Sequence, residues 1–260
     1  MQIQQIRNAM LKITFGGKTF LTDPWLAPKG SMGCFADMPM RCVDATKEHI
    51  PMPMCDLPMP LETILAGVDA YIITHIHPDH IDMTPTGIGE PLKKTTPAFV
   101  QSNEDAEALL KNGFTDVTVL FENSSLHKVQ LIKTPGRHGT KIPCGPSCGV
   151  ILKTPGEKTL YIAGDTIWYD GVKDTLLKFK PDIIIVNACG ATLVNFGRLI
   201  MHAEDVAQVH STLPSAKIIV SHMDNVAHAT VTRKDMRMSL QDLFAQHIAI
   251  MPEDGETIEL

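Results

Sequence analysis

Three histidines and an aspartate lie within six consecutive residues, in the stretch His75-Ile76-His77-Pro78-Asp79-His80. Neutral imidazole and carboxylate are the groups by which proteins hold zinc and related divalent ions. Alternation along an extended backbone places His75 and His77 on the same side, so one ion can contact both. Asp79 and His80, further along the loop, can reach a second ion. This spacing predicts a metal site, and the helical His-Glu-x-x-His motif of zinc proteases is absent.

The elements that position these side chains are predicted strands. An apolar segment at residues 68–73 immediately precedes the histidine cluster and indicates a buried strand. Three later candidates also follow apolar strands, namely His138, Asp165 and His222. Open α/β sheets bind ligands at the carboxyl ends of their strands, so the seven side chains are expected to converge on a dinuclear site. Taken singly, His138 could be a solvated loop residue, Asp165 a helix cap and His222 a core histidine.

The rest of the chain alternates between strand and helix patterns. Residues 3–22 predict a β-meander with a turn at Gly16-Gly17, and residues 149–163 predict a hairpin. Helices are expected in four later segments, at residues 104–111, 172–179, 203–211 and 234–246. This order of elements indicates two sheets packed face to face with helices outside. A strand-rich second half after about residue 145 would also fit an internally duplicated fold.

The length of 260 residues suits a single domain spanning residues 1–260, with an irregular insertion rich in proline and methionine at about 24–60. That insertion holds seven prolines and six methionines, and proline at this density prevents both helices and central strands. Methionine side chains adapt to varied apolar partners. We expect a flap that faces the substrate, with a packed structural loop or a partner-binding surface as the alternatives.

The charge and cysteine content narrow the class of protein. The formal net charge of −6 argues against a long nucleic acid as the partner, because such a partner favours a basic face. No stretch is long and apolar enough for a membrane span, and no signal peptide is evident, so a cytoplasmic protein is expected. The six cysteines are predicted to be free thiols. Cys144 and Cys148 only superficially resemble a redox pair, because three residues separate them.

Taken together, the seven ligand-type residues resemble those of the metallo-β-lactamase superfamily. Its His-x-His-x-Asp-His motif is matched at residues 75–80, and its later single histidine, aspartate and final histidine are matched by His138, Asp165 and His222. The opening segment, ending in Asp23-Pro24, is also similar to the superfamily's first strands. Within the superfamily, the chain is most similar to small hydrolases related to the ascorbate-phosphate lactonase group.

The resemblance implies an α/β fold, a four-layer αβ/βα sandwich with the site at the edge between its two sheets. It also implies two divalent metal ions, by default zinc, with manganese or iron as alternatives. By family role, His75, His77 and His138 would hold the first ion. Asp79, His80 and His222 would hold the second ion, with Asp165 as the bridge. No cysteine replaces a ligand, and no glutamate stands at the second position of the cluster; these absences disfavour the cysteine-ligated lactamases and the flavodiiron oxygen reductases.

The expected activity is hydrolysis of a small ester-like bond, such as a lactone, by a hydroxide held between the two metal ions. Asp79 would orient this nucleophile or move a proton. The alternatives are a phosphodiesterase acting on a nucleotide or phospholipid, and a metal-binding interaction protein without activity. A homo-oligomer is compatible with the sequence, and the expected partner is a small-molecule substrate.

Several residues outside the motif are candidates for supporting roles. Asp23 follows a predicted strand and could orient a metal ligand, with a turn residue before Pro24 as the alternative, and Asn187 follows another predicted strand and could line the pocket. His202 and His228 lie near strand ends, where either could bind substrate or protonate a leaving group; a surface histidine is the alternative. Arg137 and Lys141 flank His138 and could attract an anionic substrate, or remain solvated.

Overall fold

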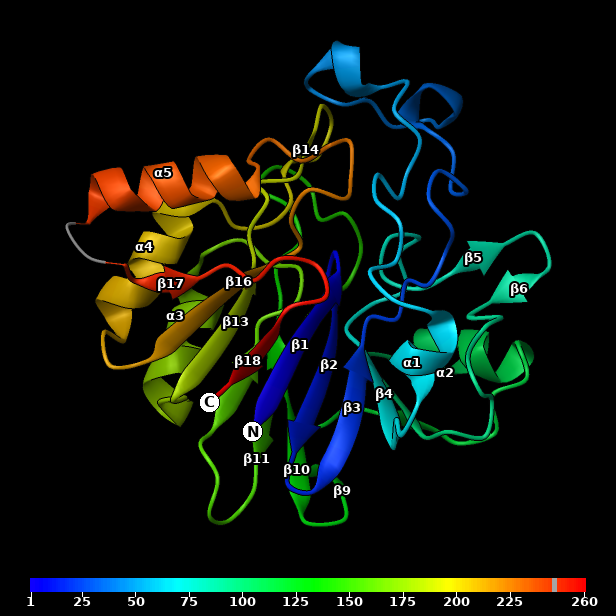
Figure 1. Cartoon of the computed structure of the whole chain (residues 1–260), viewed down its shortest axis with the longest axis vertical. Coiled ribbons are helices and arrows are strands. Elements are labelled where there is room, and N and C mark those ends of the chain that lie inside the picture. The colour runs from blue at the N-terminus through cyan, green and yellow to red at the C-terminus, as the bar shows by residue number, and fades with distance from the viewer. Residues whose placement is uncertain (245–246) are drawn as a thin grey trace.

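Two seven-stranded sheets face each other, and helices cover both outer faces (Figure 1). The computed structural model of the protein describes residues 1–244 and 247–260. Helices α1 and α2 lie against one sheet, and helices α3, α4 and α5 lie against the other. The four-layer αβ/βα sandwich expected from the sequence is therefore confirmed.

The first sheet combines an antiparallel part and a parallel part. Its strands, in spatial order, are β18 (Thr257–Glu259), β1 (Gln2–Arg7), β2 (Met10–Phe15), β3 (Lys18–Thr22), β4 (Ala70–Ile73), β7 (Ala98–Val100) and β8 (Val117–Val119). The strands from β18 to β3 pair antiparallel, which confirms the predicted meander. The strands from β3 to β8 pair parallel, so their carboxyl ends share one edge.

The second sheet repeats this pattern. Its strands, in spatial order, are β17 (Ala249–Ile250), β16 (Lys217–Ser221), β13 (Ile183–Asn187), β12 (Leu160–Ile162), β11 (Cys148–Lys153), β10 (Val129–Pro135) and β9 (Ser124–Leu126). The strands from β9 to β12 pair antiparallel, including the predicted hairpin of β11 and β12. The strands from β12 to β17 pair parallel. Both sheets thus pass from an antiparallel to a parallel half.

The helices and small sheets complete the fold. The helices are α1 (Leu61–Leu65), α2 (Asn103–Lys111), α3 (Asp170–Phe179), α4 (Ala203–Thr212) and α5 (Arg233–Leu243). Two hairpins stand outside the main sheets, formed by β5 (Met83–Thr84) with β6 (Gly87–Ile88) and by β14 (Thr192–Leu193) with β15 (Gly197–Arg198). Helix α5 starts with a capping box, in which the Thr232 and Asp235 side chains bond each other's backbone N–H groups.

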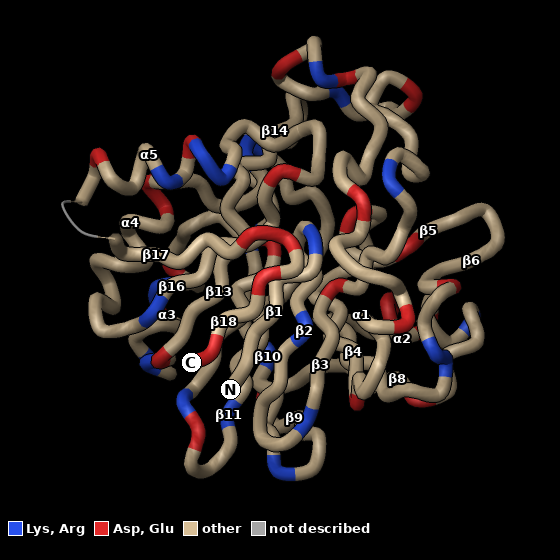
Figure 2. The backbone as a smooth tube through the Cα atoms, in the orientation of Figure 1, with Lys and Arg blue, Asp and Glu red and all other residues tan. Residues whose placement is uncertain are grey.

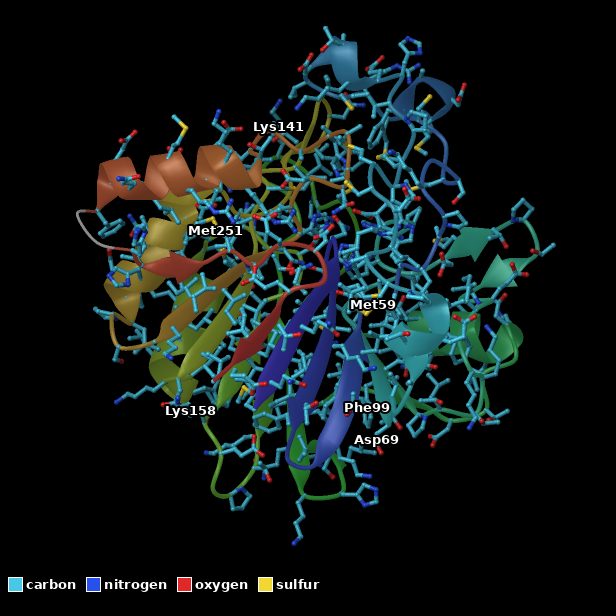
Figure 3. All side chains as sticks on the ribbon, in the orientation of Figure 1. Met59, Asp69, Phe99, Lys141, Lys158 and Met251 are labelled. Atoms are coloured by element: carbon cyan, nitrogen blue, oxygen red, sulfur yellow. The ribbon has the colours of Figure 1, made fainter. Side chains whose placement is uncertain are left out.

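The central strands are apolar on both faces because each sheet is covered by the other sheet on one face and by helices on the other. In β4, Ala70 and Ile72 pack between the sheets, whereas Tyr71 and Ile73 pack toward the helices. Phe99 of β7, labelled in Figure 3, packs in the apolar layer between the sheets. This explains why the strands appear as continuous apolar runs in the sequence.

Residues 24–60 run as an irregular excursion at the end of the sandwich (Figure 1). Only two short 3-10 helices interrupt it, η1 (Phe35–Asp37) and η2 (Ala45–Lys47). The prediction that proline would prevent regular structure here is confirmed.

The sequence misjudged several short elements. The last helix was predicted over 234–246, but α5 ends at Leu243 because Phe244 adopts an extended backbone; residues 245–246 lie outside the described residues. Strands β7, β17 and β18 and helix α1 were missed, since each is too short to show a period.

Basic and acidic residues are interspersed along the chain in the view of Figure 2. Within residues 1–244 and 247–260, no helix has both the length and the apolar character needed to cross a bilayer.

Candidate metal centre

The structure brings together all seven residues singled out from the sequence. His75, His77, Asp79 and His80 occupy the loop after β4, and the other three follow β10, β12 and β16. We call these seven residues the ligand cluster. They meet because β4, β12 and β16, which belong to the parallel parts of the sheets, and β10, which is antiparallel to β11 and so runs in the same direction as β12, all end on the same side of the sandwich.

His75, His77 and His138 form a first group whose ring nitrogens all lie within 4.8 Å of one another. The closest pair is His75 Nε2 and His77 Nδ1, 3.0 Å apart. The backbone turns sharply behind them, where His77 O accepts hydrogen bonds from the N–H groups of His80 and Ile81. Because of this turn, the side chains of Asp79 and His80 lie in a second group of potential ligands.

Asp79, His80 and His222 form a second group with the same spread of 4.8 Å. His222 Nε2 lies 3.3 Å from His80 Nε2 and 3.4 Å from Asp79 Oδ2. Asp79 is the most accessible of the three, since 13% of its side chain is exposed against 1% for His222.

Asp165 lies between the two groups. Its Oδ2 is 3.2 Å from His80 Nε2, 3.8 Å from His138 Nε2 and 3.9 Å from His222 Nε2. It also forms a third potential group with His75 and His80. A carboxylate in this position can contact ions in both groups.

The chemistry of the cluster fits divalent metal ions. Five imidazole rings approach with centroids 4.1 to 5.2 Å apart, so their nitrogen lone pairs converge on common points. Burial, together with the neighbouring histidines, lowers the pKa of His75 well below its usual value and that of His77 to about 4. Both are therefore neutral, which is the form that binds metal.

His80 is in a different electrostatic setting. Burial alone would lower its pKa, but Asp165 and Asp23 outweigh burial and raise it to about 10. Burial also opposes ionisation of Asp165, yet His80 and His222 hold the pKa of that carboxyl well below its usual range. An ion that binds His80 therefore displaces a proton.

Buried polar partners hold the cluster in place. Asp23 accepts hydrogen bonds from Thr74 N at 2.7 Å and Thr74 Oγ1 at 2.8 Å, and its Oδ2 lies 3.0 Å from His80 Nδ1 without hydrogen-bond alignment. Asn187 Nδ2 donates to Asp165 Oδ1 at 2.7 Å. His138 Nδ1 lies 3.1 Å from Leu199 O. The candidates Asp23 and Asn187 thus both contact ligand-cluster residues.

The backbone around the cluster requires unusual conformations. Gly164, just before Asp165, has a φ of 66°, and a Cβ there would lie 2.3 Å from Cys148 O. His222 and Asp23 also have positive φ values, 62° and 41°. Non-glycine residues seldom adopt this region, and they do so mainly where the surrounding structure imposes it.

Sequence reasoning missed three residues around His222. Asn8 O accepts a hydrogen bond from His222 N at 3.0 Å, and Asn8 Nδ2 donates to Asp79 O at 2.9 Å. Cys189 Sγ lies 3.6 Å from His222 Nδ1. Ser221 Oγ donates to Gln5 Oε1 at 2.8 Å. Asn8 is in a short turn between two apolar strands, so the sequence showed only a turn residue.

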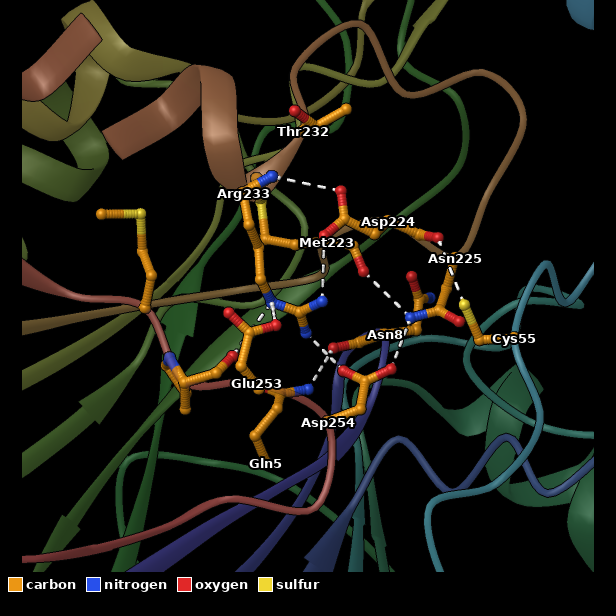
Figure 4. A network of polar contacts seen from close by, with 12 residues as sticks. Gln5, Asn8, Cys55, Met223, Asp224, Asn225, Thr232, Arg233, Glu253 and Asp254 are labelled. Atoms are coloured by element: carbon orange, nitrogen blue, oxygen red, sulfur yellow. Dashed lines mark hydrogen bonds and ion pairs between the residues drawn. The ribbon is translucent and has the colours of Figure 1, made fainter. Parts of the chain in front are cut away.

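The loop after His222 is anchored by a buried arginine (Figure 4). Arg233 pairs with Asp224 at 3.0 Å and with Asp254, and its Nε donates to Pro252 O. Asn225 Nδ2 donates to Asp254 Oδ2 at 3.0 Å. This network ties the loop that carries His222 to the segment leading into β18.

A cavity of about 100 Å³ opens above the ligand cluster. His77, Asp79, His138 and Asp165 form its floor. The side chains opposite are almost all apolar, and we call them the apolar wall: Met32, Phe35, Met38, Met40, Leu193 and Leu199. The insertion at 24–60 supplies four of these six residues, so it lines the cavity, and its role as a flap facing the substrate stays a prediction.

The remaining sequence candidates divide between the cavity and its surroundings. His228 lines the cavity, with its ring edge-to-face against Phe35. His202 instead occupies the N-cap position of α4 without a side-chain capping hydrogen bond, and its Nδ1 lies 3.3 Å from Glu204 Oε2 and 3.4 Å from Asp205 Oδ2. It is not among the described lining residues, and neither are Arg137 and Lys141.

Lys141 lies beside the β14–β15 hairpin, where its Nζ donates to Val194 O (Figure 3). All six cysteines are free thiols, as predicted. Burial raises the pKa of Cys144, on the cavity wall, to about 11 and that of Cys148 to about 12. Both are therefore protonated near neutral pH, which disfavours a redox role.

The arrangement of the ligand cluster agrees with the protein family that the sequence matches. Residues 19–223 match the family described as the β-lactamase superfamily domain. The chain belongs to the metallo-β-lactamase superfamily. It is also 38% identical over 262 residues to UPF0173 protein YddR of Bacillus subtilis (strain 168), covering 99% of each chain. The superfamily expected from the sequence is confirmed, whereas the similarity to the lactonase group stays a prediction.

Two solved structures share the whole fold at substantial identity. One is a possible metal-dependent hydrolase from Veillonella parvula DSM 2008, with 37% identity, a TM-score of 0.91, and coverage of 100% of this chain and 99% of that chain. The other is an isothiocyanate hydrolase from Delia radicum gut bacteria, with 34% identity, a TM-score of 0.88 and the same coverage. These relatives support hydrolase activity that depends on metal.

Proposed function

We propose that this metal-dependent hydrolase acts on small, uncharged, apolar substrates with an electrophilic carbon, and that isothiocyanates are the leading class. The observation that carries the proposal is the composition of the cavity. Its apolar wall faces the ligand cluster, and no lysine or arginine is among the described residues that line it. A substrate whose charge lies against the apolar wall, away from the metal ions, would lose its water there without gaining a cationic partner.

The relative with 34% identity over the full chain supports the same class, because it is named an isothiocyanate hydrolase. Small lactones are the second candidate, since they are also compact, neutral and electrophilic. A phosphodiester is the third candidate, because the metal ions would attract its charge but the apolar wall offers no hydrogen-bond partner to a polar nucleotide or headgroup. Family membership disfavours a binding protein without activity.

The proposed metal sites are the two groups of the ligand cluster, with Asp165 as the bridge and zinc as the expected metal. Manganese and iron are the alternatives. When bound, such ions lower the pKa of a water molecule to about 7 and so supply a nucleophile near neutral pH. The protein contributes neutral imidazoles, the Asp165 carboxylate and a cavity with little room for bulk water.

Asp79 is proposed to orient the attacking water. It faces the cavity, and although burial disfavours its ionisation, His80 and His222 hold its pKa well below the usual range. It therefore stays ionised and accepts a hydrogen bond. With an isothiocyanate, the water oxygen bonds to the central carbon and the nitrogen takes a proton. The resulting thiocarbamate then splits into an amine and carbonyl sulfide, so that one water is consumed.

The test combines metal analysis with turnover of three substrates: phenyl isothiocyanate, a small lactone and bis(p-nitrophenyl) phosphate. We expect about two metal ions per chain and the highest kcat/KM on the isothiocyanate. A matched control is 4-carboxyphenyl isothiocyanate, whose charge should lower kcat/KM by about tenfold or more. Preference for the phosphodiester, or equal use of the charged and uncharged isothiocyanates, would contradict the proposed substrate class.

A further inference from the structure

His228 occupies a position in the cavity that the metal sites do not explain. It comes from the loop between β16 and α5, whereas most of the ligand cluster comes from other loops. Its ring is held edge-to-face by Phe35, with centroids 5.0 Å apart, and its backbone oxygen accepts a hydrogen bond from Thr192 N. The ring is therefore fixed between the apolar wall and the floor of the cavity.

The surroundings of the His228 ring leave its Nε2 atom available to a ligand. Of the two ring nitrogens, only Nδ1 is both buried from solvent and without a hydrogen-bond partner among the described residues. A buried N–H without an acceptor costs its full desolvation penalty, so the proton of the neutral ring is better placed on Nε2. The ring is neutral near pH 7 because burial lowers the pKa of His228 to about 4.

No other described lining residue offers a comparable donor. Apart from the ligand cluster, the polar residues that line the cavity are His228 and Cys144. A thiol is a weak hydrogen-bond donor. A neutral imidazole N–H, in contrast, can stabilise negative charge that develops on a substrate, as it does in triosephosphate isomerase.

We infer that His228 Nε2–H donates a hydrogen bond to the substrate atom that gains negative charge when water attacks. This inference rests on the proposed function and identifies the residue that would recognise the substrate's heteroatom. In an isothiocyanate that atom is the nitrogen, as electrons of the C=N bond move onto it. In a lactone it is the carbonyl oxygen. His228 keeps its own proton throughout, and the proton that nitrogen finally takes comes from the attacking water.

The test compares two substitutions of similar size. His228→Leu removes the donor, whereas His228→Gln keeps an N–H near the position of Nε2. We expect the leucine variant to lose about 10²-fold in kcat, as for loss of one oxyanion donor, and the glutamine variant to recover most of this loss. Metal content should not change. His49→Leu, at an exposed position of the insertion, is the matched control with unchanged activity.

A series of para-substituted phenyl isothiocyanates separates hydrogen bonding from a structural role. Electron-withdrawing groups stabilise charge on nitrogen by themselves, so the ratio of wild-type to leucine-variant kcat should fall from the methoxy to the nitro compound. A constant ratio, or a leucine variant within about threefold of wild type, would overturn the inference.

Failure of the proposed function would be seen separately, in the wild-type protein. If wild type prefers bis(p-nitrophenyl) phosphate, the substrate class is wrong, and the leucine and glutamine variants are compared on that substrate instead. A loss in the leucine variant that glutamine restores then supports donation by His228. Equal activity of the two variants and wild type refutes it.

Discussion

The ligand cluster and the apolar wall face the same cavity but are built in opposite ways. The cluster stands on loops that follow strands, five of its seven members are buried, and several contact a fixed polar partner. The wall comes mainly from an irregular segment, and its three methionines are only half-buried. This contrast indicates that the metal ligands are held rigidly, whereas the shape of the substrate site depends on the flexible methionine side chains of the apolar wall.

The comparison predicts the largest effect at the centre of the cluster. Asp165→Asn removes the negative charge between the two groups of ligands while keeping the size of the side chain. We expect hydrolysis to fall by about 10³-fold or more, since metal ions supply several kcal/mol of transition-state stabilisation, and metal content to drop below two per chain. Metal analysis and kcat/KM check this. The exposed Asp174→Asn serves as the control, and full metal occupancy with normal turnover in D165N would disprove the bridging role.

An intermediate effect is expected for Asn187, which supports a residue of the ligand cluster without belonging to it. Asn187→Leu removes the amide that donates to Asp165 Oδ1 at 2.7 Å. Loss of such an outer partner typically weakens metal affinity or activity by about 10- to 100-fold. Competition with a chelator measures the affinity, and the exposed Asn123→Leu is the matched control. An N187L protein that holds metal as tightly as wild type would show that the cluster does not need this partner.

The smallest effect is expected in the apolar wall. Met38→Ala removes part of a half-buried side chain, so binding of an apolar substrate should weaken by about 1 kcal/mol, or roughly fivefold in KM. Metal content and kcat should stay close to wild type. Steady-state kinetics with phenyl isothiocyanate gives the answer. A drop in metal content instead would show that wall and cluster are not independent.

The sequence predicted the cluster far better than the wall. His75 to His80 follow an apolar strand in a short motif, and His138, Asp165 and His222 each follow a strand or its turn, so local patterns were enough. The contacts of Met38 or Phe35 with the cavity depend on how a segment without periodicity folds back, which no local pattern encodes. The prediction that residues 1–260 act as one domain, the cytoplasmic location and homo-oligomer formation stay predictions.

The supporting residues show the same limit. Asp23 and Asn187 were found because they end strands. Asn8 and Cys189 were missed because their contacts with His222 join positions 214 and 33 residues apart. His202 and His228 looked alike in the sequence, and only the tertiary structure separates a helix cap from a residue that lines the cavity.

The pairing of β1 with β18 has a consequence for the rate of folding. β1 pairs with β18, Gln5 bonds both Ser221 and the backbone of Gly255, and Arg233 joins Asp224 to Asp254. The histidine that completes the second group is therefore braced by residues that lie far apart in the sequence. Assembly of the second group therefore requires segments more than 200 residues apart to come together, and such non-local pairing slows folding.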